Sequence, residues 1–238
     1  MIEVANLHKK FGKFTALSNI NLTLEAGQCV ALVGPNGCGK TTLIKCLLGL
    51  VVPQQGQILI RGQATIHRHS HRAYLGYMPQ IGRYPGNLTI GQLIDMVRNL
   101  RPQQANYDEE LIDSLGISSV LSKKMSSLSG GTIQKVSAIL AFLFDPDILI
   151  LDEPTAGLDP LSSEILKQKI EKAVKQGKLV LITSHILSEL DELVTEVVFM
   201  QEGQLMLHRP VHQLMQETGE TKLSKAIISI LQSKEPHE

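Results

Sequence analysis

Residues 34–41 read GPNGCGKT, and the rest of the chain can be interpreted from this stretch. Gly34, four intervening residues, and then Gly39, Lys40 and Thr41 fit the phosphate-binding loop pattern G-x-x-x-x-G-K-[ST]. Glycines permit the backbone angles at which successive N–H groups turn toward one phosphate. Lys40 then supplies a positive charge for the outer phosphates, and the Thr41 hydroxyl can bind Mg²⁺. The stretch therefore predicts a site for ATP or a similar nucleotide with Mg²⁺.

The flanking sequence provides the strand and the helix that such a loop needs. Residues 29–33 (CVALV) form an apolar run that predicts a strand, and residues 41–50 have helical spacing, so a helix N-terminus would face the phosphates. The pattern alone would arise by accident in on the order of one chain in a hundred of this size, and its context argues against accident. The expected nucleotide contacts are Gly34, Pro35, Asn36, Gly37, Cys38, Gly39, Lys40, Thr41 and Thr42.

Composition limits the classes of function. The chain has 238 residues, with 23 basic and 23 acidic side chains, so a net charge of zero gives no general attraction to nucleic acid. Cys29, Cys38 and Cys46 form no C-x-x-C motif and suit a reducing compartment. The start of the chain lacks an apolar signal core, and the longest apolar runs are too short for a bilayer. We expect a soluble protein that reaches a membrane only through a partner.

Hydrophobic patterning predicts an α/β fold with an all-helical stretch in the middle of the chain. Strand patterns precede and follow a stretch in which only helices are indicated, including one at residues 89–100 with a capping box at Thr89 and Gln92. We predict a phosphate-loop core with a mostly parallel sheet, an antiparallel β part and an inserted helical subdomain. The single domain would comprise a core lobe of about residues 1–80 and 146–220, a helical lobe of about 81–145, and C-terminal helices of about 210–233.

Two carboxylates end a strongly apolar strand at residues 148–154 (ILILDEP). Ligands of open parallel sheets bind at such strand ends, so Asp152 could hold Mg²⁺ through water. Glu153 could orient and partly deprotonate the water that attacks the γ-phosphate. An Asp-Glu pair at a strand end is more often only a polar cap. Its position after the phosphate loop favours the catalytic interpretation.

With these motifs the sequence resembles, over nearly its whole length, the ATP-binding subunits of ABC transporters. LSGGT at 128–132 is similar to the family signature LSGGQ, and YMPQ, AGLDP and TSHIL match the family's Q-loop, D-loop and switch motifs. Thr132 departs from the signature's final glutamine, and Gln134 lies two residues further on. The roles that the resemblance implies are base stacking for Phe11, Mg²⁺ binding and γ-phosphate sensing for Gln80, D-loop contacts for Asp159, and a catalytic hydrogen bond to the γ-phosphate for His185, beside Lys40 and Glu153.

The resemblance also implies partners. Two copies would pair head to tail, with Ser129, Gly130 and Gly131 of one copy on the ATP of the other. A transmembrane permease would dock on the helical lobe at the cytoplasmic face of the inner membrane, with a periplasmic accessory protein as a further partner through the permease. Within the family, residues 76–101 look like the ATPase of nitrous-oxide reductase maturation, which assembles a copper–sulfur site. The alternative is a multidrug or organic-solute exporter ATPase.

Two other function classes remain as alternatives. One is a soluble ABC-type ATPase that acts on nucleic acid or ribosomes; the short interval between loop and signature, without heptads, and the single cassette argue against it. The other is an ATP-gated scaffold with little hydrolysis, against which Glu153 argues. His67, His69 and His71 could bind Cu or Zn, but an exposed connector is favoured because no cysteine or carboxylate completes a site. Cys38 could be a site of oxidation, or simply a small residue that fits the loop.

Overall fold

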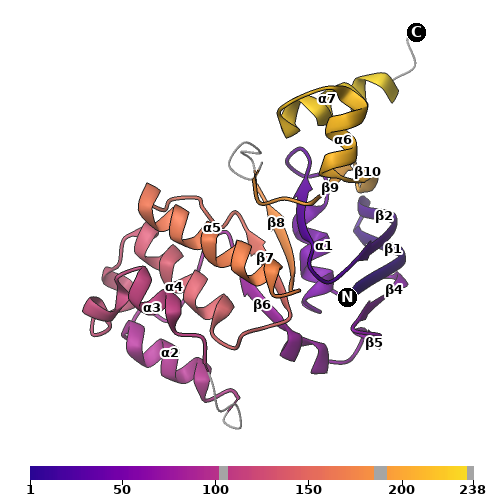
Figure 1. Ribbon diagram of the computed structural model, residues 1–238. Coiled ribbons are helices and arrows are strands. Elements are labelled where there is room, and N and C mark those ends of the chain that lie inside the picture. Colours follow the sequence, from indigo (N-terminus) through magenta and orange to yellow (C-terminus); the bar gives the residue numbers. More distant parts are fainter. Residues whose placement is uncertain (102–106, 185–191, 235–238) are drawn as a thin grey trace.

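Two β-sheets frame the protein in the computed structural model, which describes residues 1–101, 107–184 and 192–234 (Figure 1). The larger sheet has the strand order β10-β9-β3-β8-β7-β6. Its strands from β9 to β6 pair in parallel, and β10 pairs with β9 in antiparallel fashion. The bounds are β3 (Cys29–Val33), β6 (Leu75–Met78), β7 (Ile148–Asp152), β8 (Leu179–Thr183), β9 (Glu196–Gln201) and β10 (Gln204–Pro210).

The smaller sheet is antiparallel, with the strand order β2-β1-β4-β5. It consists of β1 (Ile2–Phe11), β2 (Phe14–Leu24), β4 (Gln55–Ile60) and β5 (Gln63–Ala64). The alternation expected in β2 is present, since Ile20, Leu22 and Leu24 are all buried. The predicted fold class, a mostly parallel sheet with an antiparallel β part, is confirmed.

The central strands supply two hydrophobic cores because alternate side chains of a strand point to opposite faces. In β7, Ile148 and Ile150 pack with the antiparallel sheet and with α1 (Lys40–Leu47). Leu149 and Leu151 pack on the other face, against the remaining helices. Figure 1 shows this layering, with α1 and the indigo strands on one side of the large sheet and α4 and α5 on the other.

The segment between β6 and β7 is helical and packs on the face of the large sheet opposite α1. Between β6 and β7 the described residues contain no strand beyond an isolated bridge from Thr89 to Lys124. The elements there are α2 (Ile90–Arg98), α3 (Glu110–Ser114), α4 (Gly130–Phe142) and the short 3₁₀ turns η2 (Ile117–Val120) and η3 (Met125–Ser127); η1 (Ser70–Tyr74) precedes β6. The predicted capping box of α2 is present, since Gln92 N donates to Thr89 Oγ1 at 3.2 Å and Thr89 N to Gln92 Oε1 at 2.9 Å.

Three further helices complete the described chain: α5 (Pro160–Lys175), α6 (Val211–Thr218) and α7 (Leu223–Lys234). The apolar face of α7 packs within the protein, since Leu223, Ala226 and Ile227 are buried. Ile228 on the same helix is exposed. No helix in the described part of the chain is both long and apolar enough to cross a membrane.

Candidate nucleotide-binding site

The phosphate-binding loop connects the buried strand β3 to α1, as the sequence predicts. Two of its glycines cannot be replaced without moving backbone. A Cβ on Gly34 would lie 2.1 Å from the carbonyl oxygen of Met200, and one on Gly39 would lie 2.4 Å from that of Ala16, and both glycines have positive φ. The loop is thus packed against β2 and β9, which fixes the direction of its N–H groups.

Lys40 begins α1 and lies over the loop. Its Nζ donates to the carbonyl oxygens of Gly34 at 2.7 Å and Pro35 at 3.2 Å. Cys38 is 3% exposed, with its sulfur 3.9 Å from Lys40 Nζ. This burial favours the interpretation of Cys38 as a small residue that fits the loop.

A pocket of about 450 Å³ brings the loop together with residues that are far away in the sequence. Gln80 reaches it from the end of β6, and Asp152 and Glu153 from the end of β7. The carboxyl ends of parallel strands meet at one edge of a sheet, which explains why they converge. The lining residues are Phe14, Asn36, Gly37, Cys38, Gly39, Lys40, Thr41, Thr42, Gln80, Asp152 and Glu153.

The donor atoms in this pocket suit Mg²⁺. Thr41 offers a hydroxyl, Gln80 an amide oxygen and Asp152 a carboxylate, and these hard oxygen ligands are the ones that Mg²⁺ prefers. Asp152 is the last residue of β7 and pairs in register with Thr183 of β8, whose Oγ1 donates to Asp152 Oδ1. The hydrogen bond orients the carboxylate at the edge of the sheet.

Glu153 has a left-handed backbone with φ 53°, which is uncommon for a residue with a side chain. Its N–H donates to the carbonyl oxygen and the hydroxyl of Thr183, both at 3.1 Å. Its own carbonyl accepts from Gln134 Nε2 at 3.2 Å and from Ala156 N at 3.2 Å. Sequence reasoning gave Gln134 no such role, because nothing local indicates a contact between residues so far apart.

A second hollow, of about 270 Å³, lies beside the loop and is lined by Phe14, Pro35, Asn36 and Glu202 among others. Phe14 borders both hollows and is 59% exposed. The resemblance assigned base stacking to Phe11, which the structure does not place in either lining. Phe11 is instead the cross-strand neighbour of Phe14, with Lys9 Nζ 5.0 Å from its ring centroid. Both rings are accessible, since Phe11 is 50% exposed, and Phe14 is the one that borders the pocket.

The residues of the signature lie away from this pocket. Ser129 is the N-cap of α4: its Oγ accepts from Thr132 N at 3.3 Å and lies 2.9 Å from Thr132 Oγ1. Gly130 and Gly131 follow in the first turn, and none of the three signature residues Ser129, Gly130 and Gly131 borders the phosphate loop's pocket. The hydroxyl and the helix N-terminus remain on the surface, where an anion could approach.

Asp159 is the N-cap of α5 and also lies outside the pocket. Lys135 of α4 lies 2.9 Å from its carboxylate, and Ser162 N donates to it at 2.9 Å. The Lys135 ammonium, together with the hydrogen bonds that the backbone N–H and the hydroxyl of Ser162 donate, holds the pKa of Asp159 well below its usual range. The expected catalytic residue His185 lies outside the described residues.

The histidine segment differs in part from the expected exposed connector. His67 and His69 are exposed, but the side chain of His71 is fully buried, so that interpretation is wrong for His71. Its ring packs against Gly49, where an added Cβ would lie 3.1 Å away, and burial lowers its pKa. The described residues contain no group of three or more His, Cys, Asp or Glu side chains that could hold a metal ion.

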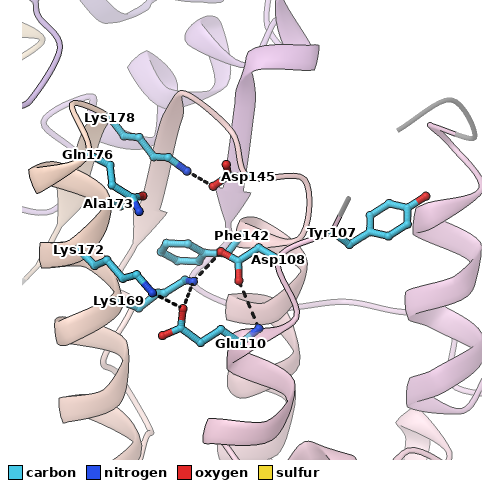
Figure 2. A pocket seen from close by; sticks show the side chains of 10 residues that line it. All are labelled: Tyr107, Asp108, Glu110, Phe142, Asp145, Lys169, Lys172, Ala173, Gln176 and Lys178. Atoms are coloured by element: carbon cyan, nitrogen blue, oxygen red, sulfur yellow. Dashed lines mark hydrogen bonds and ion pairs between the residues drawn. The ribbon is translucent and has the colours of Figure 1, made fainter. Parts of the chain in front are cut away.

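A charged pocket of about 270 Å³ lies apart from the loop, between α5 and the chain around α3 (Figure 2). Lys169 Nζ, in a side chain only 7% exposed, contacts the carboxylates of Asp108 and Glu110, and Lys172 also pairs with Glu110, at 2.8 Å. Lys178 pairs with Asp145 nearby. The lysines of this pocket are thus matched by carboxylates, which ties α3 and the chain just before it to α5.

Sequence comparison gives a family match and named relatives. A profile described as ABC transporter matches residues 17–156. The chain is 31% identical over 220 residues to a Nod factor export ATP-binding protein of Burkholderia lata, covering 90% of this chain and 72% of the relative. It is 32% identical over 209 residues to a lantibiotic transport ATP-binding protein of Streptococcus pyogenes, covering 88% and 90%. A probable multidrug ABC transporter ATP-binding protein of Escherichia coli is 36% identical over 194 residues, 79% of this chain and 34% of the relative.

Solved structures share the fold. An ATP-binding subunit of an ABC transporter superposes with a TM-score of 0.88 at 24% identity, covering 97% of this chain and 99% of the other. A dimeric ATP-binding cassette in a post-hydrolysis state with ADP and Pi gives a TM-score of 0.79 at 24% identity, covering 88% and 98%.

Proposed function

Because the chain belongs to the ABC transporter family and is an ATP-hydrolysing, ATP-binding subunit, we propose that two copies of it drive a separate membrane permease. The observation that carries the proposal is the pocket in which the phosphate loop, Gln80, Asp152 and Glu153 converge. A loop alone would explain nucleotide binding. The Glu153 carboxylate in the lining of the same pocket supports hydrolysis as well.

Each group in the pocket has a distinct task. The loop N–H groups and Lys40, at the N-terminus of α1, bind the β- and γ-phosphates. Thr41, Gln80 and Asp152 would hold Mg²⁺, which when bound neutralises charge on the phosphate oxygens. Glu153 orients the attacking water and accepts its proton, and Phe14 offers a ring face to the base. The resemblance adds His185 as a hydrogen-bond donor to the γ-phosphate.

The second copy of the chain is proposed to complete each site. Ser129, Gly130 and Gly131 lie at an exposed helix N-terminus away from their own subunit's pocket, which suits a γ-phosphate held by another subunit. Head-to-tail pairing would place each signature over the partner's phosphate loop, with Asp159 near the shared surface. ATP would then close the dimer, and hydrolysis would release it.

The permease is proposed to dock on the helices α2–α4, at the cytoplasmic face of the membrane. The relatives above are named for Nod factor export, lantibiotic transport and multidrug transport, which favours an exporter of an organic solute. None of these names refers to nitrous-oxide reductase, so the narrower copper–sulfur interpretation and its periplasmic accessory protein rest only on the resemblance of residues 76–101.

Glu153→Gln tests the proposal. The amide keeps the shape of the side chain but cannot accept the proton, so we expect ATP binding to remain and phosphate release to fall at least about a hundredfold. Phosphate release from Mg·ATP gives the turnover, and size-exclusion chromatography with ATP should detect a dimer of the variant. Undiminished turnover in Glu153→Gln, or a purified wild-type protein that ignores Mg·ATP, would contradict the proposal.

A further inference from the structure

Glu153 depends on other elements for its backbone conformation. A left-handed backbone at a residue with a side chain persists only where the surroundings hold it. Thr183 fixes the Glu153 N–H from β8, and the Glu153 carbonyl receives one hydrogen bond from Ala156 within the same loop. Another hydrogen bond to that carbonyl comes from Gln134, at 3.2 Å, on α4.

Gln134 occupies a position where an amide is costly. It lies on the buried face of α4 and is only 5% exposed. Its buried neighbours on that helix include Val136, Ala138 and Ile139, so an apolar side chain would be the ordinary choice there. A buried amide is tolerated where it makes hydrogen bonds, and Gln134 donates one to the carbonyl of Glu153.

The same part of α4 contacts the loop after Glu153 at two more places. Gly131 lies so close that an added Cβ would be 2.8 Å from the carbonyl oxygen of Gly157. Lys135, next to Gln134, pairs with Asp159 at 2.9 Å. The first turns of α4, which follow the N-cap Ser129, therefore contact this loop at residues 153, 157 and 159.

We propose that Gln134 is a positioning residue for hydrolysis, which holds the Glu153 backbone so that its carboxylate faces the nucleotide pocket. The inference rests on the proposed role of Glu153. It adds a link inside one subunit: α4, whose N-terminus is proposed to meet the partner's nucleotide, is joined through Gln134 to the subunit's own hydrolytic carboxylate. An α4 that is fully seated therefore keeps Glu153 aligned, and a displaced α4 releases it.

Gln134→Met tests this link, because methionine has a similar volume and lacks the amide donor. We expect kcat for ATP to fall about tenfold or more, since small misplacements of catalytic groups carry such costs, while KM and the affinity for fluorescent TNP-ATP stay within about twofold. Gln168→Met is the matched control. Gln168 is exposed on α5, and its Nε2 donates to Glu164 Oε1 of the same helix at 3.0 Å, so kcat should not change.

A double-mutant cycle separates positioning from a general loss of structure. If Gln134 acts through Glu153, then Gln134→Met in the Glu153→Gln background leaves the residual turnover unchanged. Should Gln134→Met fail to fold, Gln134→Asn keeps a polar side chain that is too short to reach the carbonyl. The same loss of kcat with little change in KM and nucleotide affinity is expected for it. An unchanged kcat in a folded variant, an equal loss of kcat and nucleotide affinity, or additive effects in the cycle would each overturn the inference. A wild-type protein without ATPase activity would instead refute the proposed function itself.

Discussion

Phe14 and Phe11 face each other across the end of the β1–β2 hairpin, and only Phe14 borders the nucleotide pocket. Phe14→Ala should therefore raise KM for ATP about tenfold with little change in kcat, since stacking of a base on an aromatic ring is worth about 1–3 kcal/mol. Phe11→Ala is the matched control, with an expected effect of less than about twofold. Steady-state kinetics over a range of ATP concentrations distinguishes the two. A larger effect from Phe11→Ala would restore the original assignment.

At this scale the sequence predicts what is encoded within a few neighbouring residues. The loop and the Asp152–Glu153 pair could be predicted because each is a short contiguous motif whose residue types suit a phosphate or a metal ion. The sequence did not indicate that Phe14 borders the pocket, because the side of the hairpin that each aromatic faces depends on the register of β1 with β2, which is irregular near that end. The burial of His71 likewise depends on its contact with Gly49, which lies 22 positions earlier in the printed sequence.

At the scale of elements, α3 and α5 are joined by the charges drawn in Figure 2. Lys169 and Lys172 lower the pKa of Glu110 from its ordinary 4.5 to about 2. A lowered carboxyl pKa contributes stability that is fully present above about pH 4.5 and is lost as pH falls toward about 2. Because the side chain of Glu110 is 49% exposed, solvent screening limits this contribution to about 1 kcal/mol.

Glu110→Gln should therefore lower the free energy of unfolding by up to about 1 kcal/mol at pH 7, with the difference from wild type vanishing near pH 2. Urea unfolding at several pH values, followed by circular dichroism, measures this. Glu164→Gln removes the same charge from an exposed position on α5 and serves as the control. A pH-independent difference between Glu110→Gln and wild type would contradict the role of the ion pairs.

The sequence predicts where each element begins and ends better than it predicts which other elements it contacts. Periodicity located the strands before and after the helical stretch, and the capping box located the start of α2. Periodicity could not predict the order β3-β8-β7 in the sheet or the contact between α4 and residues 153–159. Both bring together segments that are far apart in the sequence. The ion pairs between α3 and α5 were missed for the same reason.

At the scale of the whole molecule, head-to-tail pairing predicts that two inactive variants restore activity when mixed. Ser129→Arg blocks the surface offered to the partner, and Glu153→Gln disables the subunit's own site. In a mixed dimer, one site combines intact Glu153 from the first variant with intact Ser129 from the second, while the other site carries both defects. We expect the mixture to regain up to about a quarter of wild-type turnover, since about half of the dimers formed at random have one intact site of two.

Phosphate release by each variant alone and by the equimolar mixture measures this effect. A mixture of Ser129→Arg with a second preparation of Ser129→Arg is the control for protein concentration. If the mixture of Ser129→Arg with Glu153→Gln turns over ATP no faster than the two variants measured separately, a site shared between two copies is excluded.

The order of strands in the large sheet sets a length requirement on the bound molecule. β8 lies between β3, which leads into the phosphate-binding loop, and β7, which ends at Asp152. Two strand spacings amount to about 10 Å, so the distance to be bridged is close to the extent of a triphosphate chain with its metal. We expect a chain shortened by one phosphate to remain bound at the loop after β3 without reaching the edge of β7. On this expectation, the spacing of hydrogen-bonded strands would let the pocket distinguish a triphosphate from a diphosphate.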